Sequence, residues 1–426
     1  MKGRRRMNSL QEKVVGYIRE NQDELIGFLG DLIRIPSVNH GITGDEKPCQ
    51  EFMAKKYQEL GLEVDLFSPD SVSGIIDHPG FLPGRDYRER PNVVGTYRSN
   101  CAQSSVMLAG HIDVVPEGRH DDWLYGPFSG AVKNGKIYGR GACDDKYAVA
   151  ASYFALKAVI ESGIPLSKDV CLASVVDEEK GGGNGSLAAC LKYPCDEYLY
   201  LDGAEQAAIA GVGGSVMNID VTAVDFVSTA VPVFNGIKLL IEHLEGLERQ
   251  LVSQLTADPL YTNAECAKYP LRLYNVGIGS PIGASYNRGR LTYTIYSFDN
   301  KAELEKKIQF FLDDINSNEF KHMGLRAKGP VWTTRYFERT SVASDSPVVS
   351  KYREAYHLAA GKELPIGCSV LSDYYLYNNY GGGHTLMTGL SRPFFEPECP
   401  HNVNESNDID RVVDFACAIA LYLLLD

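Results

Sequence analysis

The stretch LAGHIDVVP, residues 108–116, places a histidine and an aspartate directly after an apolar run. The run 106–109 predicts a buried strand, so His111 and Asp113 lie at its C-terminal end. In open α/β sheets that end is where ligands bind. A metal-binding histidine usually needs a carboxylate that fixes its tautomer, and Asp113 is placed to supply one. By itself the pair is a weak signal, because most such pairs are structural, and the rest of the chain has to support it.

Composition limits the class of protein. A chain of 426 residues is long enough for two domains. The net charge of -13 argues against nucleic acid and anionic membranes as partners. The basic start is followed by polar residues rather than an apolar signal segment, and no apolar run reaches membrane-spanning length. The ten cysteines show no Cys-x-x-Cys spacing, so we expect reduced thiols and a cytoplasmic protein.

The order of predicted elements indicates an α/β sheet flanked by helices, with a smaller α+β domain inserted into it. Helices are expected over 10–33, 49–60, 146–161, 348–358 and 409–424, and strands over 62–67, 91–95, 106–109, 170–176 and 198–201. The insertion reads strand 216–223, helix 233–251, strands 271–278 and 290–297, and helix 302–316, an order typical of ferredoxin-like domains. We therefore expect residues 1–212 and 328–426 to form the first domain and residues 213–327 to form the second.

Acidic or imidazole side chains follow several of the other predicted strands and loops. GRGACDDK, residues 139–146, places Asp144 before a long helix, where a plain N-cap is the alternative. VVDEE, residues 175–179, runs a strand into three carboxylates, whose burial costs several kcal/mol unless cations neutralise them. Asp202 follows another strand, and His401 lies in a loop before the last helix.

Together these residues suit two divalent cations, most simply zinc, with cobalt or manganese as alternatives. Two metals need a bridging carboxylate, for which Asp144 is the best candidate, and each would also hold one histidine and one terminal carboxylate. The chemistry implied is hydrolysis, because such cations lower the pKa of water towards ~7 and polarise a carbonyl. One carboxylate should stay off the metals to take a proton, and Glu178, beside the expected ligand Glu179, is that candidate.

Taken in chain order, these motifs resemble the di-zinc amidohydrolases and peptidases, a family that includes acetylornithine deacetylase, succinyl-diaminopimelate desuccinylase, aminoacylase and dipeptidases of the carnosinase and PepV type. The resemblance covers residues from about 25 to the end. It implies that one zinc ion is held by His111, Asp144 and Asp202, and the other by Asp144, Glu179 and His401. It also implies that Asp113 orients His111 and that Glu178 is the general base. The implied fold is a catalytic α/β domain with an inserted lid domain that often mediates a homodimer.

Three positions depart from that family. Asp202 stands where most members have glutamate, although the peptidase branch accepts aspartate. Phe226, nine residues before Asn235, stands where members carry a lid histidine that donates to the oxyanion, a contact worth ~3 kcal/mol in the barrier. The lid strand that usually carries a carboxylate-binding arginine reads TIYS at 294–297. Candidates for that role are Arg288, Arg290 and Arg392.

These features leave three hypotheses. The first is a metal-dependent hydrolase of a small amide, a deacylase or a deformylase. It rests on DHPG at 77–80, RPNVV at 90–94 and LEGLE at 244–248, which resemble acetylornithine deacetylase-like and formyl-aminopyrimidine deformylase-like enzymes. The second is a metallo-dipeptidase, favoured by the DDK spelling at 144–146. The third is a non-catalytic or weakly active metal-binding homologue, which Phe226 supports and the complete ligand set opposes.

Overall fold

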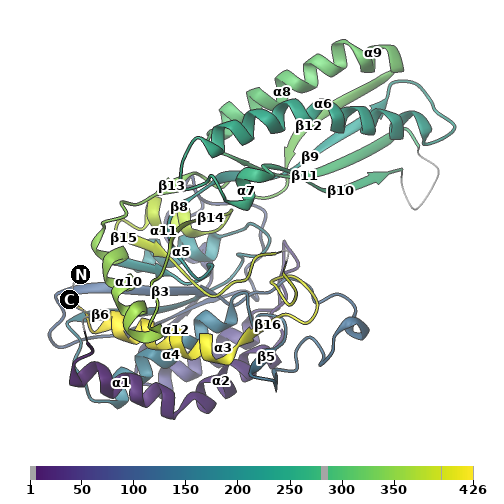
Figure 1. The fold of residues 1–426 in the computed structure, drawn as a ribbon. Helices are drawn as coiled ribbons and strands as arrows, with labels where there is room; N and C mark the ends of the chain where they lie inside the picture. The colour runs from purple at the N-terminus through teal and green to yellow at the C-terminus, as the bar shows by residue number, and fades with distance from the viewer. Residues whose placement is uncertain (1–5, 280–285, 395, 426) are drawn as a thin grey trace. The chain divides into compact units, whose positions relative to one another are not determined.

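The computed structural model describes residues 6–279, 286–394 and 396–425, and the chain divides into two compact units. Unit 1 comprises Met1–Ile209, Ser341–Ser369 and Asp373–Asp426, and unit 2 comprises Ala210–Thr340 with Val370–Ser372. Figure 1 shows unit 2 continuing from unit 1 in the middle of the chain and returning to it, so the insertion expected from the sequence is present. No described helix is long and apolar enough to span a membrane.

A mixed sheet forms the centre of unit 1 (Figure 1), in the order β1-β2-β6-β3-β7-β15-β8-β13, with β14 paired to β8. Its strands are β1 (Glu63–Phe67), β2 (Asn92–Tyr97), β3 (Ser104–His111), β6 (Lys168–Val175), β7 (Glu197–Tyr200), β8 (Ala207–Gly211), β13 (Thr340–Ser341), β14 (Ile366–Ser369) and β15 (His384–Met387). The four strands β6, β3, β7 and β15 are parallel to one another. Parallel pairing requires crossovers, which the intervening helices supply.

The helices of unit 1 pack around this sheet. They are α1 (Ser9–Glu20), α2 (Gln22–Arg34), α3 (Lys47–Glu59), α4 (Lys146–Glu161), α5 (Asn184–Lys192), α10 (Pro347–Ala360), α11 (Tyr374–Tyr380) and α12 (Ile409–Leu423). Helix α4, expected over 146–161, is buried almost all round because β3 packs on one side and α2 and α12 on others. A smaller sheet of β4 (Ala131–Lys133), β5 (Lys136–Tyr138) and β16 (Ser406–Asp408) lies beside it.

The single helix expected over 10–33 is two helices, because the chain breaks at Asn21. The main-chain N–H and the side-chain Nδ2 of Asn21 both donate to the Tyr17 carbonyl, which ends α1. Asparagine competes in this way with helical hydrogen bonds, so it favours helix ends over helix interiors. The apolar periodicity continues across the break because both helices bury the same side.

Unit 2 is a four-stranded antiparallel sheet covered by two long helices. The strand order is β10-β11-β9-β12, from β9 (Gly213–Ala223), β10 (Leu271–Ile278), β11 (Arg288–Ser297) and β12 (Leu325–Trp332). The helices α6 (Val231–Thr256) and α8 (Lys301–Ser317) contribute leucine and isoleucine side chains to its core, and α7 (Glu265–Lys268) and α9 (Glu319–Met323) are short. Strand β12 completes the ferredoxin-like order and places residues 328–330 in unit 2, whereas the sequence assigns residues from 328 onward to the first domain.

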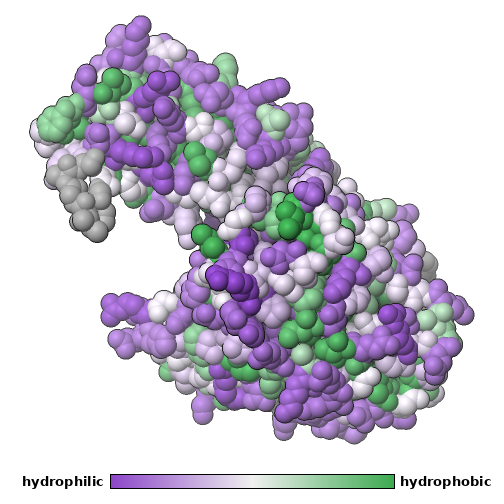
Figure 2. Space-filling view, turned by 180° about the vertical axis from the view of Figure 1, so that it is seen from behind, coloured by the Kyte–Doolittle hydropathy of each residue, from purple (hydrophilic) through white to green (hydrophobic). Residues whose placement is uncertain are grey.

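The surface is predominantly polar on the face seen in Figure 2, where apolar residues form separate patches. Exposed large apolar side chains occur in both units, among them Leu124 and Phe394 in unit 1 and Phe226 and Tyr274 in unit 2. Scattered apolar residues of this kind are normal on a folded protein.

Candidate metal centre

The expected site residues of unit 1 meet where parallel strands end. Strand β3 ends at His111 and lies between β6 and β7, with His111 opposite Val175 and Ala109 opposite Tyr200. The carboxylates of 177–179 follow β6 and Asp202 follows β7, so all of them emerge at the same edge of the sheet. This is the edge at which open α/β sheets bind ligands.

Asp144 joins two clusters of donor atoms. Its Oδ1 atom lies 3.0 Å from His111 Nε2, and its Oδ2 atom lies 3.2 Å from His401 Nε2. His111 Nε2 also lies 3.9 Å from Asp202 Oδ2, and His401 Nε2 lies 2.7 Å from Glu179 Oε2. The first cluster is therefore His111, Asp144 and Asp202, and the second is Asp144, Glu179 and His401, each with its donor atoms within 4.8 Å of one another.

The donor set fits two zinc-like ions. Imidazole nitrogens and carboxylate oxygens bind zinc at about 2.0–2.2 Å, which separates ligands around a tetrahedral ion by roughly 3.3 Å. The four imidazole–carboxylate separations given above, 2.7 to 3.9 Å, lie on either side of that value. One oxygen of Asp144 faces each imidazole, which is the arrangement that a bridging carboxylate requires.

Burial and mutual charge perturb these groups strongly. Burial opposes a charged imidazole, but the hydrogen bond to Asp144 and the Asp202 carboxylate raise the pKa of His111 well above its usual value. Burial likewise opposes a charged Asp144, yet hydrogen bonds from His111 and His401 hold its pKa below the usual value. Burial and the neighbouring Asp144 raise the pKa of Asp202 to about 7. Such perturbed clusters are typical of functional sites.

Asp113 contacts His111 in a different way from the expected one. The Nδ1 atom of His111 lies 2.9 Å from the Asp113 main-chain oxygen and 3.7 Å from its carboxylate. The carboxylate instead accepts the main-chain N–H of Glu178 at 3.2 Å and of Glu179 at 3.1 Å, and Nδ2 of Asn39 at 2.8 Å. Asp113 therefore orients the imidazole through its main chain and anchors the glutamate loop through its side chain.

Glu178 stands apart from the two clusters. Its hydrogen bonds are made by its main chain, whose N–H donates to Asp113 and whose carbonyl accepts from Gly181, and among the described residues none involves its carboxylate. Burial and the nearby Asp202 raise the pKa of Glu178 well above its usual value. A carboxylate with its oxygens available is what a general base needs.

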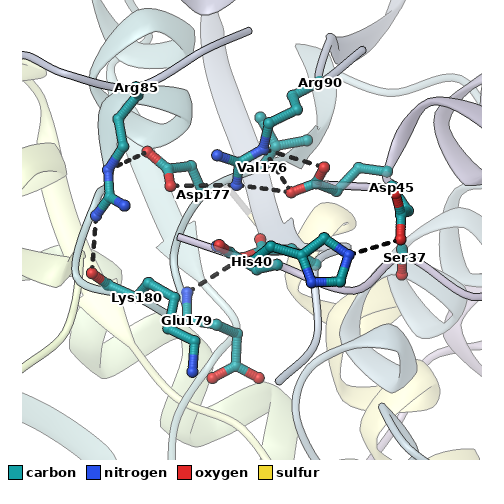
Figure 3. Close-up of polar contacts among 12 residues, drawn as sticks. Ser37, His40, Asp45, Arg85, Arg90, Val176, Asp177, Glu179 and Lys180 are labelled. Carbon is teal, nitrogen blue, oxygen red and sulfur yellow. Dashed lines mark hydrogen bonds and ion pairs between the residues drawn. The ribbon is translucent and has the colours of Figure 1, made fainter. Parts of the chain in front are cut away.

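Asp177 is neutralised by protein groups, although the sequence suggested cations for all three carboxylates of residues 177–179. Its Oδ1 atom lies 3.2 Å from Arg90 Nη2, and its Oδ2 atom accepts the Tyr87 hydroxyl at 2.6 Å. Figure 3 shows Arg85 and Arg90 on either side of Asp177. The three neighbours thus divide their roles, since Glu179 alone enters a donor cluster.

Some structural partners of the site carry no recognisable sequence signal. The buried Glu405 carboxylate accepts the main-chain N–H groups of Gly141, Cys143 and Asp144 through Oε1, and it pairs with Arg140 at 2.5 Å through Oε2. It therefore shapes the loop that presents Asp144. Neither Arg140 nor Glu405 stands out in the sequence, because the two residues are 265 positions apart and only the fold pairs them.

The positions that depart from the resembled family have ordinary environments. Phe226, at the expected oxyanion-donor position, is 89% exposed. Arg288 and Arg290 both pair with Asp220 within unit 2, and Arg392 pairs with Asp408 at 2.5 Å within unit 1. Each candidate for carboxylate recognition therefore already has an acidic partner.

A model of peptidase family M20/M25/M40 matches residues 107–425. The chain belongs to this family. The match begins in β3 and ends in the residues after α12, so it contains every residue of the two donor clusters. The expected fold, a catalytic α/β sheet with a separate small antiparallel sheet, is thereby confirmed.

Curated relatives in the M20/M25/M40 family match only part of their length. The N-formyl-4-amino-5-aminomethyl-2-methylpyrimidine deformylase of Halalkalibacterium halodurans is 27% identical over 210 residues, which is 49% of this chain and 45% of that protein. The chain thus spans less than half the length of this relative.

Solved structures of the family align over almost the whole chain. Human carnosine dipeptidase 1 has a TM-score of 0.71 at 17% identity and covers 97% of this chain and 99% of its own. YXEP of Bacillus subtilis, described as a dinuclear metal binding peptidase, has a TM-score of 0.55 at 12% identity and covers 96% of this chain and 99% of its own. At these identities the likeness shows the shared fold.

Proposed function

We propose that this M20 family member hydrolyses the amide bond of a small N-acyl or N-formyl compound with two divalent cations, most simply zinc. The observation that carries the proposal is the orientation of the Asp144 carboxylate, whose Oδ1 atom faces His111 and whose Oδ2 atom faces His401. A carboxylate placed between two imidazoles, each with a further carboxylate beside it, is the ligand set for two metals.

The residues of the site have separate tasks in this proposal. His111, Asp144 and Asp202 would hold one cation, and Asp144, Glu179 and His401 the other. Such cations supply a Lewis acid and acidify water. Glu178 accepts a proton from the attacking water at its carboxylate and later delivers it to the leaving nitrogen, which balances the hydrolysis. Asp113 holds the main chain of Glu178 and Glu179, so base and ligand keep a fixed spacing.

A deacylase or deformylase is favoured because each arginine considered for binding a free α-carboxylate is already engaged. Arg288, Arg290 and Arg392 are each paired with an aspartate of their own unit. The deformylase similarity of part of the chain supports the same class. A substrate without an α-carboxylate needs none of these arginines, so their pairing with aspartates would not weaken its binding.

A metallo-dipeptidase is the second candidate, favoured by the fold likeness to carnosine dipeptidase 1 over 97% of the chain. The DDK spelling at 144–146 supports it less, because the buried Lys146 donates to the carbonyls of Leu32 and Ile35 and so serves packing. A weakly active metal-binding homologue is the third candidate, and Phe226 is its only support.

A substrate panel separates the three candidates. Zinc-loaded protein would be assayed with N-formyl amines, N-acetyl amines and dipeptides at equal concentration. Turnover of the formyl or acetyl compounds supports the first candidate and preferred turnover of dipeptides the second. No turnover of any compound by protein that binds two equivalents of zinc would favour the third.

We further propose that unit 2 forms a homodimer through its edge strand β10, where Leu273, Tyr274 and Val276 are exposed. Unpaired edge strands of this kind are templates for a second strand. In multi-angle light scattering, a wild-type mass of one chain would contradict the dimer. A wild-type dimer whose mass is unchanged by Val276→Lys would contradict its assignment to β10.

A further inference from the structure

The segment between β1 and β2 closes around the loop that carries Glu178 and Glu179. Tyr87 and Arg90 reach the buried Asp177 carboxylate, one to each oxygen, at 2.6 and 3.2 Å. Arg85 donates to the Lys180 carbonyl at 2.8 Å and lies 3.7 Å from Asp177. Figure 3 shows the Arg85 guanidinium in contact with both Asp177 and Lys180. The two residues that the proposed reaction needs, 178 and 179, thus lie between two points fixed by this segment.

Arg90 is itself held in place by hydrogen bonds to Glu46 and to the Gly41 carbonyl. Its Nε and Nη2 atoms donate to Glu46 at 2.7 to 3.1 Å, and its Nη1 atom donates to the Gly41 carbonyl at 3.2 Å. The side chains of Arg90, Glu46 and Asp177 are all at most 1% exposed. A planar guanidinium with two buried carboxylates has one favoured orientation, so Asp177 is held in one place.

The backbone conformation of Asp177 links the position of its side chain to the placement of Glu178 and Glu179. Asp177 has a φ of 69°, a left-handed conformation that residues with a β-carbon rarely adopt. The turn directs the next two residues to different tasks, with Glu179 in a donor cluster and Glu178 outside it. Gly182 passes so close that a β-carbon there would lie 2.0 Å from Asp177 Oδ2, so the carboxylate fills the inside of the loop.

We propose that Tyr87 and Arg90 are positioning residues of the reaction. They hold Asp177 in its left-handed turn, and through it they set the place of the base Glu178 and of the ligand Glu179. This proposal rests on the proposed function. It predicts that damage to the segment affects the cation shared by Glu179 and His401, and leaves the cation at His111 and Asp202 in place.

The variants are chosen to disturb Asp177 without removing a site residue. Tyr87→Phe removes the hydroxyl that donates to Asp177, Arg90→Lys replaces the planar fork by a single ammonium, and Gly182→Ala pushes a β-carbon against the Asp177 carboxylate. Arg88→Lys is the matched control for the first two, because Arg88 is exposed and pairs with Asp86 in its own turn. Gly27→Ala controls the glycine change, because a β-carbon at Gly27 meets no atom within 4 Å.

Zinc titration against a competing chelator, with kcat and KM on the best substrate of the panel, tests the proposal. Loss of outer partners of a metal site typically lowers metal affinity or activity about 10–100-fold. We expect that loss in one of the two zinc sites and in kcat for all three variants, with KM changed less than about threefold and the other zinc site unchanged. Both controls should match the wild type.

Two results would overturn the positioning role. One is a folded Tyr87→Phe and a folded Gly182→Ala that both keep wild-type zinc affinity at both sites. The other is equal weakening of the two zinc sites, which a general loss of stability would give. If Arg90→Lys does not fold, Tyr87→Phe and Gly182→Ala still test the positioning role. If the wild type turns over no substrate, the proposed function fails, while the zinc titration still tests the positioning role.

Discussion

The Nδ1 atom of His111 lies 2.9 Å from the main-chain oxygen of Asp113, while the Asp113 carboxylate turns towards the main chain of the glutamate loop. Both oxygens of that carboxylate are used, because each accepts one of two successive amides. The chain directly after β3, which ends at the expected ligand His111, therefore also holds the loop that carries the base and another ligand.

Asp113→Asn should impair the site through this loop. The amide side chain has one acceptor oxygen where the carboxylate has two, so one buried N–H is left unpaired, at about 1–3 kcal/mol. We expect kcat to fall roughly 10- to 100-fold with the fold intact by circular dichroism. Asp45→Asn is the control, since Asp45 is exposed and pairs with His40. Unchanged kcat in Asp113→Asn would contradict the anchoring role.

Glu178→Gln should separate metal binding from chemistry. A glutamine cannot accept the proton of the attacking water, so turnover should fall by about 10²–10⁴. Zinc content should stay at the wild-type value, because Glu178 lies outside both donor clusters. Glu179→Gln is the contrast and should lose one of the two zinc ions, because Glu179 belongs to one donor cluster only. If Glu178→Gln retained normal turnover, another group would have to be the base.

Glu405→Gln should destabilise unit 1. The substitution would leave Arg140, which is 2% exposed, without its carboxylate partner, and breaking a buried pair costs about 3–5 kcal/mol. Glu398→Gln is the matched control, because the pair of Glu398 with Lys136 is nearer the surface and worth about 0–1 kcal/mol. Thermal melts of both variants test this, and equal melting temperatures would show that Glu405 does not brace the Asp144 loop.

The pH dependence of unit 2 should reflect Asp220. Hydrogen bonds from Arg290 and Arg288 hold the pKa of this carboxyl below its usual value of 3.8. A lowered pKa in the folded state stabilises the protein above the unfolded value, and this stabilisation is lost as the pH falls through the folded value. The difference in melting temperature between wild type and Asp220→Asn should therefore be constant above about pH 5 and shrink as the pH falls through 3.8 and below. A difference that stays constant as the pH falls through 3.8 would refute the assignment.

The sequence predicted the parts of the fold that depend on regular patterns. Strand ends, the helix 146–161 and the inserted domain follow from apolar periodicity, and His111, Asp144, Glu179, Asp202 and His401 came from the motifs at those ends. The break at Asn21 escaped prediction because a single cap residue interrupts a periodicity that continues beyond it.

The supporting groups of the site could not be predicted in the same way. Glu405 reaches Asp144 over 261 residues, and Arg90 reaches Asp177 over 87 residues. Each contact is a pairing of charged or polar groups with no periodic pattern, and only the folded chain brings them together. The composition of the segment 68–90 gives no indication that it contacts residues 177–180.

The metal content of the purified protein tests the central claim most directly. Wild-type protein would be saturated with zinc, freed of excess ion by gel filtration and measured by elemental analysis against its concentration. Two clusters that share Asp144 predict about two zinc ions per chain. A protein that retains no zinc, cobalt or manganese under these conditions would contradict the account of the site.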